Sequence, residues 1–182
     1  MRLIFTFLLL ITLNITHAQI SVDPAFPTPT SNITVYFDAT QGNAALANCN
    51  CIVYAHAGVI TDKSTGPSDW KYVQGNWGTD DPKVKMTKVS DNLYSLTYNI
   101  QTFYNVPGGE VIKQLSFVFR NQSGTVVGRT ATGGDIYYNF PDPNAGLQYI
   151  IEKPSLESRV VSLGSTLDFK TITSKPAQIT LK

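Results

Sequence analysis

Ring-bearing side chains gather between Tyr54 and Trp77. Tyr54 and His56 lie two residues apart in the segment VYAHAGVIT, and the chain's two tryptophans, Trp70 and Trp77, follow in and just after a polar loop. Tyr, Trp and His rings combine an apolar face, which can cover the C–H face of a pyranose, with polar edges or ring nitrogens that hydrogen-bond hydroxyl groups. These residue types therefore predict a surface that binds a sugar.

A strand is expected to position the first two rings, because successive side chains of a strand point to opposite faces. In the predicted strand over residues 51–57, one face carries Val53, Ala55 and Ala57, and the other carries Ile52, Tyr54 and His56. The small apolar set belongs to the core, so Tyr54 and His56 are expected on an open face. The alternative is that Trp70 and Trp77 fold inward under the long loop and cover them.

Short alternating segments separated by turn residues predict an all-β fold. The expected strands cover residues 32–38, 51–57, 84–89, 93–99, 111–120, 125–130 and 135–140. The sequence has neither a ten-residue helical pattern nor the alternation of strands and helices that precedes a parallel sheet. We therefore predict an antiparallel β-sandwich of immunoglobulin-like type over residues 32–141, followed by a partial second β domain.

The first residues have the composition of an export signal. Met1-Arg2 is followed by the apolar run 3–15 and by Thr16-His17-Ala18, which predicts a signal peptide over 1–18 with cleavage after Ala18. The mature protein is therefore expected to be secreted, at the cell surface or in the periplasm. Residues 19–31 form a proline-rich lead-in, in which DPAFPTPTS is expected to be extended without forming an element.

The last part of the chain predicts the beginning of another domain. Residues 142–147 read as a linker, and further strands are expected at 148–153, 166–173 and 178–181. These strands are too few to close an immunoglobulin-type sandwich of about 100 residues. Residues 148–182 are therefore interpreted as the start of a truncated immunoglobulin-like domain. The alternative is that the last strands dock on the first sandwich.

The composition narrows the range of partners. The formal net charge is +1 and charged residues make up 15% of the chain, which gives no basic surface for nucleic acid or an anionic membrane. After the predicted signal peptide, no apolar run approaches the roughly 20 residues of a membrane span, so we expect no membrane insertion. A neutral partner is the simplest expectation.

Metals, cofactors and disulfides leave few signals. Cys49 and Cys51 are the only cysteines, and after export they form either a small disulfide ring or a free buried pair. Two thiolates alone do not complete a four-ligand zinc site, and Asp80-Asp81 is not part of a calcium-loop motif. Gly133-Gly134 has the character of a turn rather than a phosphate-binding loop. We therefore expect no metal and no cofactor.

Catalysis is not expected within this chain. A glycosidase needs two carboxylates that converge on one cleft, whereas the aspartates near the aromatic stretch, Asp62, Asp69, Asp80 and Asp81, have the loop positions of turn formers. His56 is the only histidine after the predicted cleavage site, and no G-x-S-x-G turn accompanies it. We expect no catalytic residues.

The order of several motifs resembles a known family. ITVYFDAT, VYAHAGVIT, DW, a tryptophan followed by PKVKM, KVSDNLYSLTY, LSFVFRNQSG and DIYYNF follow one another between residues 32 and 140. This series resembles the starch-binding modules of family 26, in particular the version at the N-terminus of secreted Bacteroidota proteins of the α-amylase class (glycoside hydrolase family 13).

The resemblance implies a binding module attached to an enzyme. Modules of this family are β-sandwiches that bind α-glucans through exposed aromatics on one strand and the following loop, which correspond here to Tyr54, His56, Trp70 and Trp77. The implied ligand is starch, glycogen or a maltooligosaccharide. Ala57 departs from the family, which often has an aromatic residue there.

In that group an immunoglobulin-like domain and an α-amylase-type barrel typically follow the module. A barrel of about 250 residues does not fit in this chain, so the implied catalytic domain is covalently continuous but absent from it. The chain itself is expected to bind and not to cut. The competing expectation is a structural or adhesive immunoglobulin-like module of a cell-surface protein with buried aromatics.

Overall fold

We describe the protein from a computed structural model that covers residues 18–142, 144–153, 164 and 166–180. The predicted signal peptide, apart from Ala18, lies outside the described residues. The strands are β1 (Ile20–Asp23), β2 (Asn32–Asp38), β3 (Val53–Thr61), β4 (Lys71–Gln74), β5 (Thr87–Ser90), β6 (Leu93–Asn99), β7 (Ile112–Asn121), β8 (Val127–Gly128), β9 (Ile136–Asn139), β10 (Tyr149–Lys153) and β11 (Lys170–Thr173). The helices are the 3₁₀ turn η1 (Pro82–Val84) and α1 (Ile100–Tyr104).

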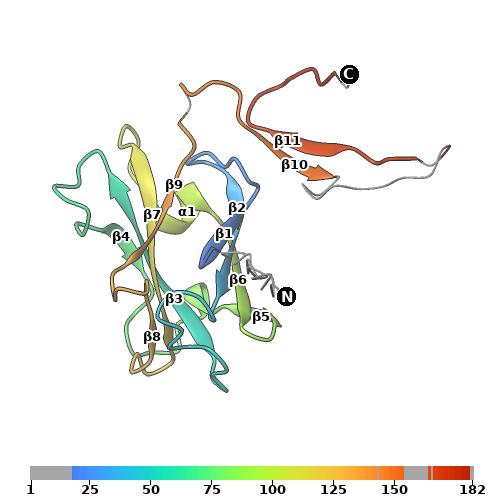
Figure 1. The fold of residues 1–182 in the computed structure, drawn as a ribbon. Helices are drawn as coiled ribbons and strands as arrows, with labels where there is room; N and C mark the ends of the chain where they lie inside the picture. The colour runs from blue at the N-terminus through green and yellow to red at the C-terminus, as the bar shows by residue number, and fades with distance from the viewer. Residues whose placement is uncertain (1–17, 143, 154–163, 165, 181–182) are drawn as a thin grey trace, which may run out of the picture.

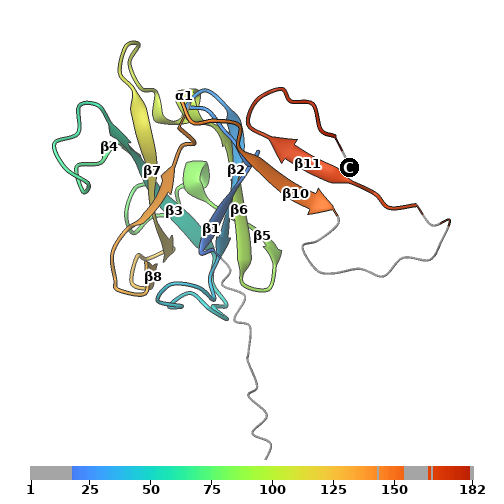
Figure 2. The same cartoon turned by 45° about the horizontal axis from the view of Figure 1, so that its top comes forward.

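Two antiparallel sheets form the body of the molecule. One has four strands in the order β1-β2-β6-β5. The other has five strands. Four of them follow the order β4-β3-β7-β8, and the fifth, β9, pairs with a separate stretch of β7. Figures 1 and 2 show the sheets as two layers, with α1 between them in both views. The prediction of an all-β antiparallel sandwich is confirmed.

Aromatic side chains join the two layers. Phe37 of β2 stacks on Phe119 of β7 with ring centroids 3.9 Å apart, and both side chains are buried. β8 approaches the same contact closely, because a Cβ on Gly128 would lie 2.9 Å from the Phe37 ring. Ile33 and Val35 continue the buried face of β2, as the alternation of its sequence predicts. The core therefore lies between the sheets.

Three short elements differ from the expectation. β1 pairs with β2 along Ile20–Asp23, so the prediction that the first strand begins at residue 32 was wrong. β4 lies within the segment expected to be only a loop. At the end of β6, the Asn99 side chain accepts a hydrogen bond from the Thr102 N–H and caps α1. Side-chain capping of this kind starts a helix without a long periodic pattern.

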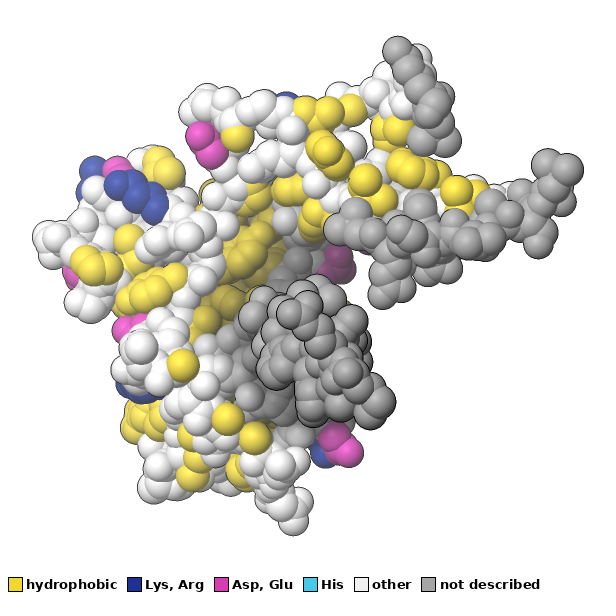
Figure 3. Space-filling view, viewed as in Figure 1, with side chains coloured by type: hydrophobic (Ala, Val, Ile, Leu, Met, Phe, Trp, Pro, Cys, Tyr) yellow, Lys and Arg dark blue, Asp and Glu magenta, His cyan; other side chains and the backbone are white. Residues whose placement is uncertain are grey.

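The last two described strands pair with each other. β10 and β11 form an antiparallel two-stranded sheet that lies to one side of the sandwich in both ribbon views. Tyr149 of β10 is exposed, as are Leu147 and Phe169 in the segments that lead into the two strands, and Figure 3 shows hydrophobic side chains gathered there. The strand expected at 178–181 is wrong over its described residues, which are irregular. Assignment of 148–182 to a second domain stays a prediction.

Candidate functional site

The outer face of the β3–β7 sheet carries the predicted aromatic residues. Ala55 and Ala57 of β3 are directly opposite Phe119 and Phe117 of β7, and all four are buried in the core between the sheets. Residues in the alternate positions of β3, which include Tyr54 and His56, therefore lie on the outer face. The sequence correctly predicts this division.

Tyr54 does not form the expected open platform. Its side chain is fully buried, although it lies on the outer face of the sheet. Its hydroxyl donates a 2.6 Å hydrogen bond to Asp80 Oδ1, and the guanidinium carbon of Arg120 lies 4.9 Å from its ring centroid. The expectation that Tyr54 is exposed for stacking on a sugar is wrong, because residues distant in sequence cover it.

Arg120 holds in place the loop over residues 75–81, called the Trp77 loop, which includes the Tyr54 partner Asp80. It is opposite Tyr54 in the β3–β7 register and is fully buried. Its Nη1 donates to the Asn121 and Gln122 carbonyls at 3.0 and 2.9 Å, and its Nη2 donates to the Asn76 and Thr79 carbonyls at 2.5 and 3.1 Å. These bonds compensate for burying the charge, and burial lowers the pKa of the guanidinium.

Arg120 also lies between two rings. Its guanidinium carbon is 5.8 Å from the Trp77 ring centroid, besides its contact with Tyr54. A guanidinium next to an aromatic face is attracted to the ring's negative face. Arg120 therefore fixes Trp77 relative to the sheet. Arg120 was not among the site residues predicted from the sequence; its place in a strand of apolar residues, FVFRN, was the available signal.

His56 brings the two tryptophans together. Its ring centroid lies 5.2 Å from that of Trp77 in an edge-to-face arrangement and 6.2 Å from that of Trp70. Nδ1 is 2.7 Å from the Gly75 carbonyl oxygen. A carbonyl only accepts hydrogen bonds, so Nδ1 carries the hydrogen in this contact, and in the Nδ1–H tautomer Nε2 is an acceptor. Three of the four predicted residues therefore form one cluster.

Trp70 is the less accessible of the two tryptophans. It packs over Gly58, where an added Cβ would lie 3.2 Å from the Trp70 side chain. Its Nε1 donates a 3.4 Å hydrogen bond to the hydroxyl of Tyr137, which was not among the predicted site residues. Tyr137 lies on β9, opposite Ser116 of β7. Trp70 and Tyr137 thus form the half-buried edge of the cluster.

Trp77 provides the accessible surface of the cluster. Its side chain is 45% exposed, whereas Trp70 is half-buried and Tyr54 is fully buried. A Cβ on Gly124 would lie only 2.4 Å from the Trp77 Nε1, so the indole rests directly on the turn after β7. The loop therefore presents a ring that is both exposed and held against the sheet.

The nearby carboxylates have structural partners. Asp80 accepts from Tyr54, and Asp81 caps η1 by accepting from the Lys83 N–H at 3.0 Å. Asp62 accepts from the Val111 N–H, and Asp69 accepts from the Thr65 N–H. These two backbone donors are the largest cause of the lowered pKa of the Asp62 and Asp69 carboxyl groups.

Over the described ranges, no group of three or more His, Cys, Asp or Glu side chains has the arrangement of a metal site. Among the same residues, no helix is both long and apolar enough to traverse a bilayer. The cluster of His56, Trp70 and Trp77 itself offers aromatic faces, a histidine acceptor and backbone groups.

Buried tyrosines should make the fold sensitive to alkali. Burial, with a smaller contribution from the Asp80 contact, raises the pKa of Tyr54 to about 12, and burial also raises the pKa of Tyr98 and Tyr104. An unfolded tyrosine releases its proton near pH 10. Between about pH 10 and 12 the folded state thus retains protons that the unfolded chain releases, so the unfolding free energy should fall as pH rises.

Urea denaturation at about pH 8 and about pH 11 tests this expectation. The midpoint should be lower at the higher pH, and the drop should be smaller in Tyr54→Phe, which has no hydroxyl to ionise. An equal midpoint at both pH values would contradict the expected linkage.

The fold and the cluster define an antiparallel β-sandwich with aromatic residues on the outer face of one sheet. The chain belongs to the family described as "Domain of unknown function (DUF8578)", whose family model matches residues 20–127. The matched region begins at β1 and contains Tyr54, His56, Trp70, Trp77 and Arg120. No curated protein matches the chain.

Proposed function

We propose that this chain binds starch or a related α-glucan without cutting it. The observation that carries the proposal is the 45% exposed indole of Trp77, held beside the imidazole of His56 with ring centroids 5.2 Å apart. An exposed indole face can cover the C–H face of a glucosyl unit. The His56 Nε2 can then accept a hydrogen bond from a sugar hydroxyl.

The site is suited to binding an uncharged ligand with low affinity. The indole is fixed by Arg120 and by the turn at Gly124, so little ordering is required when a ligand binds. A single exposed ring gives a shallow site, and tethering compensates for low affinity by raising the local concentration. In this proposal the exported chain holds polysaccharide near an α-amylase-type catalytic domain that is continuous with it but absent from this sequence.

Affinity electrophoresis tests the proposal directly. The mature chain should migrate more slowly in a gel containing soluble starch than in a plain gel, whereas a dextran gel should leave its mobility unchanged. Trp77→Ala should migrate in starch as it does without starch, because the exposed face is removed. Tyr149→Ala is a matched control, since Tyr149 is an exposed aromatic on β10, and it should be retarded like the wild type.

Two results would reject this function: a wild type that starch does not retard, or a Trp77→Ala variant that is retarded as strongly as the wild type. The variant's far-ultraviolet circular dichroism should match that of the wild type, so a loss of retardation reports binding.

A structural or adhesive module without sugar binding is the second candidate. The burial of Tyr54 and the half-burial of Trp70 favour it, because rings that stabilise a loop need no ligand. Tryptophan fluorescence separates the two functions. Maltooligosaccharide should protect Trp77 from a collisional quencher if the cluster binds glucan, and should leave quenching unchanged if the module is only structural.

A further inference from the structure

A polar groove adjoins the Trp77 loop at the end of the sandwich where β3 begins and β7 ends. Its volume is about 490 Å³. The groove is lined by Asn50, Cys51, Ile52, Gly78, Asn121, Gln122 and Ser123. None of these lining side chains is charged, and all except Cys51, Ile52 and Gly78 end in an amide or hydroxyl group. The chemistry of the walls is therefore that of a site for a neutral ligand rich in hydroxyl groups.

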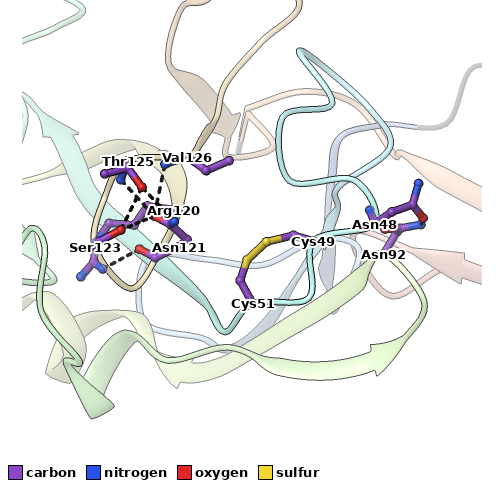
Figure 4. The surroundings of a disulfide bond; sticks show 9 residues. All are labelled: Asn48, Cys49, Cys51, Asn92, Arg120, Asn121, Ser123, Thr125 and Val126. Atoms are coloured by element: carbon purple, nitrogen blue, oxygen red, sulfur yellow. Dashed lines mark hydrogen bonds between the residues drawn. A yellow bond between two sulfur atoms is a disulfide. The ribbon is translucent and has the colours of Figure 1, made fainter.

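The turn after β7 forms one wall of the groove and is firmly held. The Asn121 Oδ1 accepts hydrogen bonds from the Thr125 and Val126 N–H groups at 3.0 and 3.2 Å. Arg120 donates to the carbonyls of Asn121 and Gln122. Figure 4 shows the Asn121 side chain inside this turn. The backbone that carries the Gln122 side chain is thus fixed before any ligand binds.

The turn before β3 also lines the groove and contains the disulfide. Cys49 and Cys51 are bonded to each other and separated by Asn50 alone. On the preceding side, Asn48 and Asn92 exchange two hydrogen bonds, and on the following side β3 pairs with β7. A disulfide across so short a loop removes little chain entropy from the unfolded state. Its main effect is local, because it fixes the backbone at Asn50.

Two glycines make the groove continuous with the Trp77 surface. The Trp77 indole rests on Gly124 of the same turn that forms the first wall. A Cβ on Gly78, the residue after Trp77, would lie 3.4 Å from the Ser123 carbonyl oxygen, so the Trp77 loop and the turn meet along the groove. A chain bound on the Trp77 ring can therefore continue into the groove.

We propose that this groove is a second glucosyl subsite, which makes the site recognise a chain of sugar units. The inference rests on the proposed function, since the first unit is the one on Trp77. Asn50 and Gln122 are exposed, line the groove and supply amide groups to sugar hydroxyls. Ile52, 43% exposed, supplies apolar surface for the C–H groups of the ring.

Calorimetric titration with methyl α-glucoside, a single glucosyl unit, and maltohexaose tests the subsite. The wild type should bind maltohexaose more tightly than methyl α-glucoside. The Asn50→Ala/Gln122→Ala variant should lose about tenfold in affinity for maltohexaose, as expected for two lost hydrogen bonds, and less than about twofold for methyl α-glucoside. Gln101→Ala is a matched control at an exposed amide on α1, outside the groove, and should bind both sugars like the wild type.

The outcomes separate this inference from the function on which it rests. If Trp77→Ala abolishes binding while the double groove variant binds maltohexaose like the wild type, the subsite is overturned and glucan binding stands. If the wild type binds neither sugar, both proposals fail together. A loss of affinity equal for methyl α-glucoside and maltohexaose in the double variant also overturns the subsite, because it indicates that the two amides contact the first unit.

Discussion

Tyr54→Ala is expected to lower the free energy of unfolding by about 3–5 kcal/mol, the range for removing a large buried ring. The Tyr54 side chain has no exposed surface. Other residues cover its ring on the outer face of the sheet, where the guanidinium of Arg120 lies over it. Truncation therefore leaves a cavity and removes one of the partners of the Asp80 carboxylate, which also pairs with Lys85 at 3.7 Å. The residue expected from sequence to bind sugar is expected here to support the fold.

Tyr54→Phe is the matched variant, because it keeps the ring and removes only the hydroxyl. It should cost about 1 kcal/mol, the net value of one hydrogen bond. Urea denaturation gives both free energies, and affinity electrophoresis below the unfolding transition gives retention on starch. Tyr54→Phe should be retained like the wild type. A Tyr54→Ala variant as stable as the wild type that lost only its retention would show that the ring contacts the ligand instead.

The sequence predicts the sandwich because most strands alternate apolar and polar residues against one core. Ile33, Val35 and Phe37 are buried in β2 as their spacing predicts. β4 is missed because it is only four residues long and lies in a segment rich in turn residues, with Tyr72 at a positive φ of 52°. Among the strands that the structure describes it pairs with β3 alone, so tertiary contacts decide its conformation.

The candidate site is less predictable than the fold. Alternation assigns Tyr54 and His56 to one face of β3, and this is correct. Alternation does not reveal whether that face is open, because its cover comes from the Trp77 loop and from Arg120, which is 66 positions after Tyr54 in the chain. The alternative that Trp70 and Trp77 fold inward over both rings is wrong for Trp77, which is 45% exposed. Tyr54 is buried, but its contacts are with Asp80 and Arg120, and the two tryptophans lie against His56.

Replacing Arg120 with methionine is expected to lower the free energy of unfolding by about 3 kcal/mol and to release the Trp77 loop. The guanidinium donates four hydrogen bonds to backbone carbonyls of the loop and the turn. Methionine fills part of the volume but donates none. The Asn76 and Asn121 carbonyls keep a donor in the Thr79 hydroxyl and the Gly124 N–H, whereas the Thr79 and Gln122 carbonyls lose their Arg120 donor, at a cost of about 1 kcal/mol or more each. The carbonyls of Asn76 and Thr79 bracket Trp77, so its position depends on these bonds.

Arg129→Met provides the matched control for this prediction. Arg129 is partly exposed and forms a salt bridge with Asp135 at 2.5 Å, so its replacement should cost less than about 1 kcal/mol. In a Trp70→Phe background, Trp77 is the only tryptophan, and its fluorescence reports the loop. Arg120→Met should shift the emission to longer wavelength and weaken retention on starch, whereas Arg129→Met should change neither. An Arg120→Met protein with unchanged stability, emission and retention would show that Arg120 does not hold the site.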